Sequence, residues 1–284
     1  MGGRELRDKI AGAVYGFVIG GAVRVVASSF DRESQSSCLH DVEDAICESS
    51  LDLDDESQMT WCIMKVLVEC PDLDNLEASR FKRMVADEFA RWDDSHGVQV
   101  DSILNDGIDK YRKLHKFADK VDNAFGRKAL IRAMPCAVIG RDDLNLAQAD
   151  ITYPCEASHR GLQMYSKLLK SYLMCKYPYN ESKCLRSHLE ASEGDRKSID
   201  SAHSIMLDLA RLSSRPTFKE CVTETVANKD SSPEAILAAC SLIGARFGLE
   251  QVPRKWIGKL DVKWKCKAGA FINFATKYLK NFSL

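Results

Sequence analysis

The sequence lacks an excess of charge of either sign, and it lacks a long uncharged hydrophobic stretch. Forty Lys and Arg face 41 Asp and Glu, which gives a formal net charge of -1. A chain without a strong positive field is not drawn to nucleic acid or to an anionic membrane surface, so we expect neither as a partner. The apolar run 10–23 is closed by Arg24 and is too short to span a bilayer comfortably.

Paired cysteine motifs are also missing. The eleven cysteines include no Cys-x-x-Cys pair, and Cys62, Cys136 and Cys240 stand inside apolar helical patterns, where a thiol acts as a small hydrophobe. This usage predicts a reducing, intracellular compartment, and we expect a cytoplasmic location. Cys155 and His159 are one helical turn apart, but no second pair accompanies them. We therefore expect no zinc site and interpret both as fold or ligand-pocket residues.

Alternation of apolar and polar residues with a period of two is almost absent, which argues against strands. Apolar residues instead recur at helical spacing, and prolines fall mostly between the periodic segments. The sequence predicts an all-α fold in one domain, 1–284. The expected helical segments are 10–23, 59–67, 73–89, 100–116, 157–176, 198–212, 233–247 and 264–280.

Three glycines recur at every fourth position of the first apolar segment: Gly12, Gly16 and Gly20. This spacing places them on one face of a helix, where another helix backbone can approach closely. We predict that this segment is a buried central helix.

The acidic run Asp54, Asp55 and Glu56 directly precedes an amphipathic helix. Carboxylates at this position either cap the helix and complement its dipole, or hold a divalent cation with hard oxygen ligands. The residues alone leave both interpretations open, and we favour capping.

Several segments, taken in chain order, resemble the motifs of the ADP-ribosylglycohydrolase family. They are the opening Gly-Ala-x-x-Gly-x-x-x-Gly-Asp-Ala helix (12–22), the Thr-Asp-Asp-Thr-Gln-Met metal motif (54–59), an aromatic and Trp segment (89–92), the Gly-Asn-Gly-x-x-Met-Arg-x-x-Pro loop and helix (126–135), a Ser/Thr-His pair (158–159), and an Ala/Gly-rich last core helix with a Pro-x-x-Trp continuation (238–256). The resemblance implies a single-domain orthogonal multi-helix bundle of that family's type.

The departures from the family pattern fall on its metal ligands. Active relatives hold two Mg²⁺ ions between the first acidic motif and an Asp-x-Asp-Thr motif, which here reads 231–234, Ser-Ser-Pro-Glu. Gly21 stands where the opening helix normally has an acid, and Arg24, Ser28 and Ser29 stand where another acid usually follows that helix. The Ser231-x-x-Glu234 pattern is typical of a capping box. The resemblance therefore implies a degenerate binuclear site, with at most one weakly held Mg²⁺ on Asp54, Asp55 and Glu56, or none.

We expect ligand binding to be retained although the metal site is degenerate. The resemblance places Gly126 and Lys128 in the loop that cradles a diphosphate, with Arg132 one turn further on, and Ser158 and His159 beside the ligand. We expect an ADP-ribose-type nucleotide or a protein partner as the binding partner.

Two hypotheses follow. The first is a pseudoenzyme that binds such a ligand or partner, or serves as a structural component. The second is an active hydrolase that removes ADP-ribose from a modified substrate at a one-metal or metal-free site, with Asp55 and Glu56 as catalytic residues positioning water. We favour the first.

Overall fold

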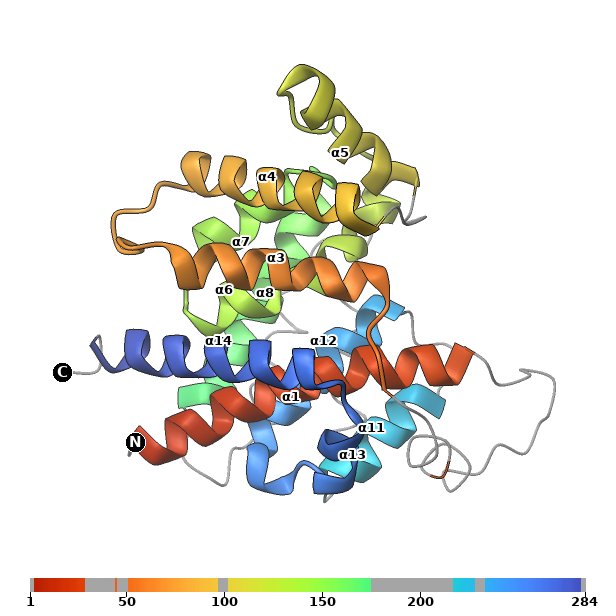
Figure 1. Ribbon diagram of the computed structural model, residues 1–284, viewed down its shortest axis with the longest axis vertical. Helices are drawn as coiled ribbons and strands as arrows, with labels where there is room; N and C mark the ends of the chain where they lie inside the picture. Colours follow the sequence, from red (N-terminus) through yellow and green to blue (C-terminus); the bar gives the residue numbers. More distant parts are fainter. Residues whose placement is uncertain are drawn as a thin grey trace, which may run out of the picture.

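The computed structural model describes residues 3–28, 44, 51–96, 102–174, 217–227 and 233–281. Within these ranges the chain is helical, apart from connecting loops and one isolated β-bridge between Leu51 and Leu260 (Figure 1). The all-α prediction is confirmed. In chain order the helices are α1 (Gly3–Ser28), α3 (Asp55–Glu69), α4 (Ala78–His96), α5 (Ser102–Leu114), the 3-10 helix η1 (Asn123–Arg132), α6 (Met134–Val138), α7 (Asp142–Ala149), α8 (Glu156–Met174), α11 (Phe218–Ala227), α12 (Pro233–Phe247), the 3-10 helix η2 (Leu249–Gln251), α13 (Arg254–Lys259) and α14 (Val262–Asn281).

Helix α1 is the central element. Over 10–23 its side chains are apolar all round rather than on one stripe, which is the pattern of a helix covered on every side. Ile10, Val14 and Phe17 are almost completely buried. Figure 1 shows α1 crossing the molecule beside α14 and α12, and α12 is its principal neighbour. The prediction of a buried central helix is confirmed.

The glycine strip of α1 lies against the backbone of α12. A Cβ on Gly12 would collide with the carbonyl of Gly244, and a Cβ on Gly16 would collide with the carbonyl of Cys240. Gly244 meets Gly12 in the same way from the other side. The two helices therefore cross at backbone contact, which requires glycine at these positions.

Most of the predicted helical segments are found within a few residues of their expected limits. The segment 233–247 is α12, and 100–116, 157–176 and 264–280 correspond to α5, α8 and α14. The segment 198–212 lies outside the described residues. One prediction is wrong in part: 73–77 is a loop, because the Arg141 guanidinium donates hydrogen bonds to the carbonyls of Leu73 and Leu76 and satisfies them outside a helix.

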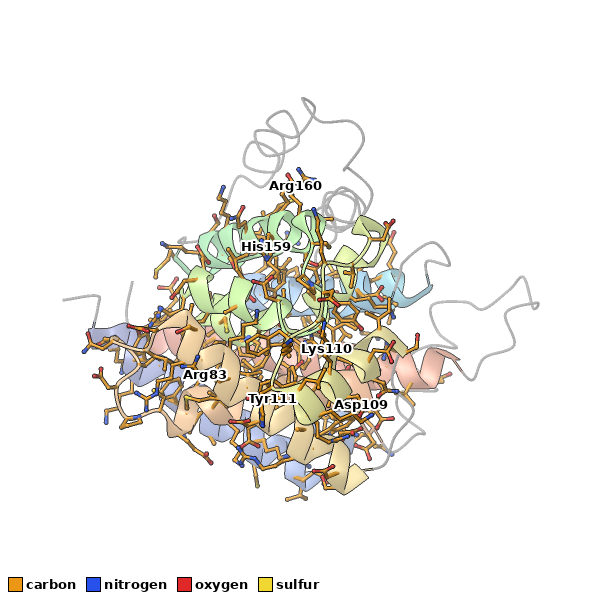
Figure 2. All side chains as sticks on the ribbon, turned by 90° about the horizontal axis from the view of Figure 1, so that it is seen from above. Arg83, Asp109, Lys110, Tyr111, His159 and Arg160 are labelled. Atoms are coloured by element: carbon orange, nitrogen blue, oxygen red, sulfur yellow. The ribbon has the colours of Figure 1, made fainter. Side chains whose placement is uncertain are left out.

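Polar contacts between side chains, in addition to apolar packing, hold α5 against α4. The hydroxyl of Tyr111 donates to Oδ1 of Asp87 at 2.8 Å, and Arg112 pairs with Asp93 at 2.6 Å. Figure 2 shows Tyr111 beside Arg83 of α4, and it shows His159 and Arg160 apart from them on α8. Helix α5 is thus an outer layer on α4.

Candidate functional site

The acidic run begins α3, and Asp54 is its N-cap. Oδ1 of Asp54 accepts the backbone N–H of Ser57 at 2.7 Å, and the Asp54 carbonyl accepts the N–H of Gln58 at 2.9 Å. The side-chain amide of Gln58 donates to the carbonyl of Leu53 at 2.9 Å. These bonds satisfy N–H groups that the first turn would leave unpaired. The capping interpretation of Asp54 is confirmed.

The second oxygen of Asp54 faces a cation from α1. The guanidinium of Arg24, near the end of that helix, forms an ion pair with Oδ2 of Asp54. Both side chains are about four-fifths buried, at 18% and 20% exposed. An ion pair in this position neutralises a carboxylate of the first metal motif from within the chain.

The N-terminal parts of α3 and α12 meet α1 at Gly21. A Cβ on Gly21 would lie 2.8 Å from the Leu53 side chain, 3.1 Å from Oγ of Ser57 and 3.3 Å from the side chain of Leu237 on α12. Ser57 is fully buried, and its Oγ has no hydrogen-bond partner among the described residues. The place where the family pattern has an acid is therefore occupied by neighbouring side chains, which would have to shift to admit a larger residue.

The first turn of α12 carries the second ion pair. Oε1 of Glu234 lies 3.2 Å from Nζ of Lys128, which comes from η1. The Glu234 side chain is 2% exposed and that of Lys128 is 24% exposed. The start of α12 also favours a carboxylate through its dipole. Pro233 begins the helix, while Ser231 and Asp230 lie outside the described residues, so the capping box stays a prediction.

Arg132, one of the residues predicted to bind a ligand, is part of the core. The residue is 3% exposed. Its guanidinium donates to Oε1 of Gln148 at 3.2 Å and to Oγ1 of Thr152 at 2.6 Å. The rings of Phe89 and Tyr153 lie 5.1 and 5.5 Å from it. This environment is typical of a buried cation that joins η1 to the following helices.

Ser158 and His159 start α8, which packs on η1. Ser158 is fully buried and donates to the carbonyl of Tyr153 at 2.8 Å, with Sγ of Cys155 at 3.2 Å. His159 is about one-third exposed, and its Nε2 lies 2.7 Å from Oδ1 of Asp150. The structure therefore places Lys128, Ser158 and His159 on two touching elements, each with a partner from the chain itself. Gly126 lies within η1, and its surroundings lie outside the description.

The described residues do not fit a pair of divalent metal ions. One oxygen of Asp54 caps α3 and the other faces Arg24, while Glu234 faces Lys128. No group of three or more His, Cys, Asp or Glu side chains close enough to hold a metal occurs in the part of the chain that the structure describes. The Glu56 side chain lies outside that part, so a single weak ion on Asp54, Asp55 and Glu56 stays a prediction.

The sequence does not predict the two ion pairs. It indicates Arg24 only as a replacement for an acid and Lys128 only as a phosphate ligand. No local sequence signal identifies the pairs, because Arg24 stands thirty residues from Asp54 and Lys128 more than a hundred residues from Glu234.

Comparisons with known proteins agree with the fold. A model of the family described as ADP-ribosylglycohydrolase matches residues 3–163, more than half of the chain. The chain belongs to the ADP-ribosylglycohydrolase family. It is 23% identical over 287 residues to the ADP-ribosyl-[dinitrogen reductase] glycohydrolase of Rhodospirillum rubrum, with 93% of this chain and 94% of that protein covered.

A solved structure titled "ADP-ribosylglycohydrolase-related protein complex" superposes with a TM-score of 0.69. It is 17% identical and covers 96% of this chain and 99% of its own, so the likeness shows a common fold. No helix among the described residues is both long and apolar enough to cross a membrane.

Proposed function

We propose that this chain is an ADP-ribosylglycohydrolase-family protein that does not carry out metal-dependent hydrolysis, and that it acts by binding an ADP-ribose-type ligand or a protein partner, or as a structural component. One observation carries the proposal. Arg24 neutralises Asp54 in the first metal motif, and Lys128 neutralises Glu234 where the second motif stands.

Electrostatics explains why the two ion pairs matter. Like charges 4 Å apart repel by about 4 kcal/mol for each pair of unit charges at an effective dielectric constant near 20. A divalent cation that shared Asp54 with the Arg24 guanidinium would meet about twice that repulsion. Mg²⁺ also demands near-octahedral oxygen ligands, and the capping bond to Ser57 already uses one oxygen of Asp54.

Ligand binding at η1 and α8 needs an exchange of partners. Lys128 contacts Glu234, and His159 contacts Asp150. A phosphate placed between them would have to replace at least one carboxylate, and it would offer charge-assisted bonds in exchange for those that are lost. The predicted ADP-ribose-type ligand therefore stays compatible with the geometry, at a cost in affinity.

Isothermal titration and a turnover assay test the proposal together. We expect no heat of binding with millimolar Mg²⁺ and no release of ADP-ribose from an ADP-ribosylated protein, with or without the metal. Titration with ADP-ribose or with a candidate partner protein then distinguishes the binding roles. Metal-dependent release of ADP-ribose would overturn the proposal and favour the active one-metal hydrolase.

The variants Asp55→Asn and Glu56→Gln identify the residues responsible if turnover is found. Catalytic groups would lose turnover with little change in the free energy of unfolding. Residues that only support the helix start would lose about 1 kcal/mol of stability and keep the rate.

A further inference from the structure

A second concave site lies between α3, α4 and α14. It is a cavity of about 500 Å³, and all of its lining residues come from these three helices. Figure 1 shows α4, α3 and α14 in succession across one face of the molecule. None of the lining residues belongs to α1, α12, η1 or α8, so this groove is separate from the candidate site described above. Its volume is within the usual range for small-molecule sites.

The wall of the groove is aromatic and held in place. Trp61 and Trp264 stack with their ring centroids 5.5 Å apart and 23° between their planes. The indole N–H of Trp264 donates to Oδ1 of Asp52 at 2.6 Å, which fixes the ring. Trp92 and Phe271 complete the apolar lining. These four side chains are buried, at 9% exposed or less, so they form an apolar floor of the groove that a ligand can cover.

The charge around the groove is positive. Four cations and two carboxylates line it: Lys65, Arg91, Lys263, Lys267, Glu69 and Glu88. Glu88 is already paired with Lys65 at 3.0 Å and with Arg91 at 2.5 Å.

Two hydrogen-bond donors at the groove have no acceptor among the described residues. Lys267 has no carboxylate partner among the described residues, and its Nζ lies 4.7 Å from the centroid of the Trp264 ring. The N–H of Trp61 is buried in the wall without a hydrogen-bond acceptor in the described part of the chain. A buried donor without an acceptor carries a desolvation penalty that an acceptor entering the groove would remove.

We propose that this groove binds an aromatic anion of about the size of a mononucleotide, with its ring over the apolar floor and its anionic group at Lys267. Apolar contact and charge act together here, because the ring covers apolar surface of the groove while the anionic group meets the lysines. The proposal does not rest on the proposed function of the metal-motif region.

Intrinsic fluorescence makes the groove directly observable. The chain has four tryptophans, and three of them line the groove. The fourth, Trp256, is 1% exposed and packs near Phe218 in the core. Titration of the whole chain with adenosine monophosphate should give saturable quenching of tryptophan emission. Uncharged adenosine should bind at least tenfold more weakly, because it lacks the anionic group.

Matched variants assign the effect to this site. Lys267→Gln should weaken binding of adenosine monophosphate about tenfold, whereas Lys265→Gln, on the same helix but outside the lining, should leave it unchanged. Lys128→Met separates this site from the one at η1, because a loss of quenching in Lys128→Met but not in Lys267→Gln would place the nucleotide at η1 and overturn the proposal. Circular dichroism confirms that each variant is folded.

Naphthalene-2-sulfonate serves as a second probe by calorimetry. Binding of both anions supports a general site for aromatic anions, and binding of the nucleotide alone supports a nucleotide site. The proposal is overturned if neither anion binds at millimolar concentration, or if Lys267→Gln binds as tightly as the unchanged chain.

Discussion

At the scale of single residues, the pair between Lys128 and Glu234 carries the largest expected effect. Replacing Lys128 by Met leaves the Glu234 carboxylate, 2% exposed, without its cation. Removing one partner of a fully buried pair costs 3–5 kcal/mol, and the partial exposure of Lys128 reduces this to about 2 kcal/mol. Unfolding in urea, followed by circular dichroism, measures the change.

Two companion variants check the cause. Lys113→Met breaks the exposed pair with Asp109, at 2.8 Å, and should change stability much less. The double variant Lys128→Met with Glu234→Gln should recover part of the loss, because no buried charge is then left unpaired. Equal losses in Lys128→Met and Lys113→Met would contradict the assignment.

Contacts between single residues differ in whether the sequence can predict them. Asp54 could be predicted as a cap because its partner, Ser57, is three residues away. The partner of Lys128 is more than a hundred residues away and the partner of Asp54 on α1 is thirty away, so both ion pairs depend on how the helices pack. Arg132 was assigned to a ligand for the same reason, since the sequence does not show that Gln148 and Thr152 surround it.

At the scale of helices, the crossing of α1 and α12 depends on glycine. Gly12→Ala would put a methyl group into the backbone of Gly244 and Gly248. Overpacking of this kind costs about 1–3 kcal/mol, and more where the obstacle is backbone. We therefore expect a loss of at least 3 kcal/mol, or no folded protein, in thermal and urea unfolding.

Gly269 provides the matched control for that substitution. It lies within α14, and a Cβ there would meet nothing within 4 Å. Gly269→Ala should raise the free energy of unfolding by about 1 kcal/mol through helix propensity alone. If Gly12→Ala were no more harmful than Gly269→Ala, the close crossing would be wrong.

Helix limits were predictable where periodicity was strong and uninterrupted. Segment 233–247 coincides with α12 because Pro233 marks its start and an apolar pattern runs to its end. The short helices α7 and α11 were not predicted, since each has only about two or three turns and too few apolar repeats to stand out. Segment 73–77 has buried leucines at helical spacing but is a loop, because Arg141 donates hydrogen bonds to the carbonyls of Leu73 and Leu76.

At the scale of the whole molecule, stability should fall at alkaline pH. Burial, together with the hydrogen bond to Asp87, raises the pKa of Tyr111 from 10.0 to about 12. Below pH 10 the phenol is neutral in both states and its contribution is complete. Between pH 10 and 12 only the unfolded chain loses the proton, so the free energy of unfolding declines with pH, by up to about 2 kcal/mol from this group.

The variant Tyr111→Phe tests this dependence. It should cost about 1 kcal/mol at neutral pH through the lost hydrogen bond, and its stability should decline less steeply between pH 10 and 12. Urea midpoints measured at several pH values give the comparison. An unchanged slope would show that Tyr111 does not ionise with unfolding.

The short stretch from Leu51 to Asp54 connects the two sites of this protein. Leu51 bridges to Leu260, Asp52 anchors Trp264 in the groove, and Asp54 meets Arg24 two residues later. The Trp264 indole and the Arg24 guanidinium are thus bound to carboxylates only two residues apart in the chain. A displacement of this stretch would shift both carboxylates together.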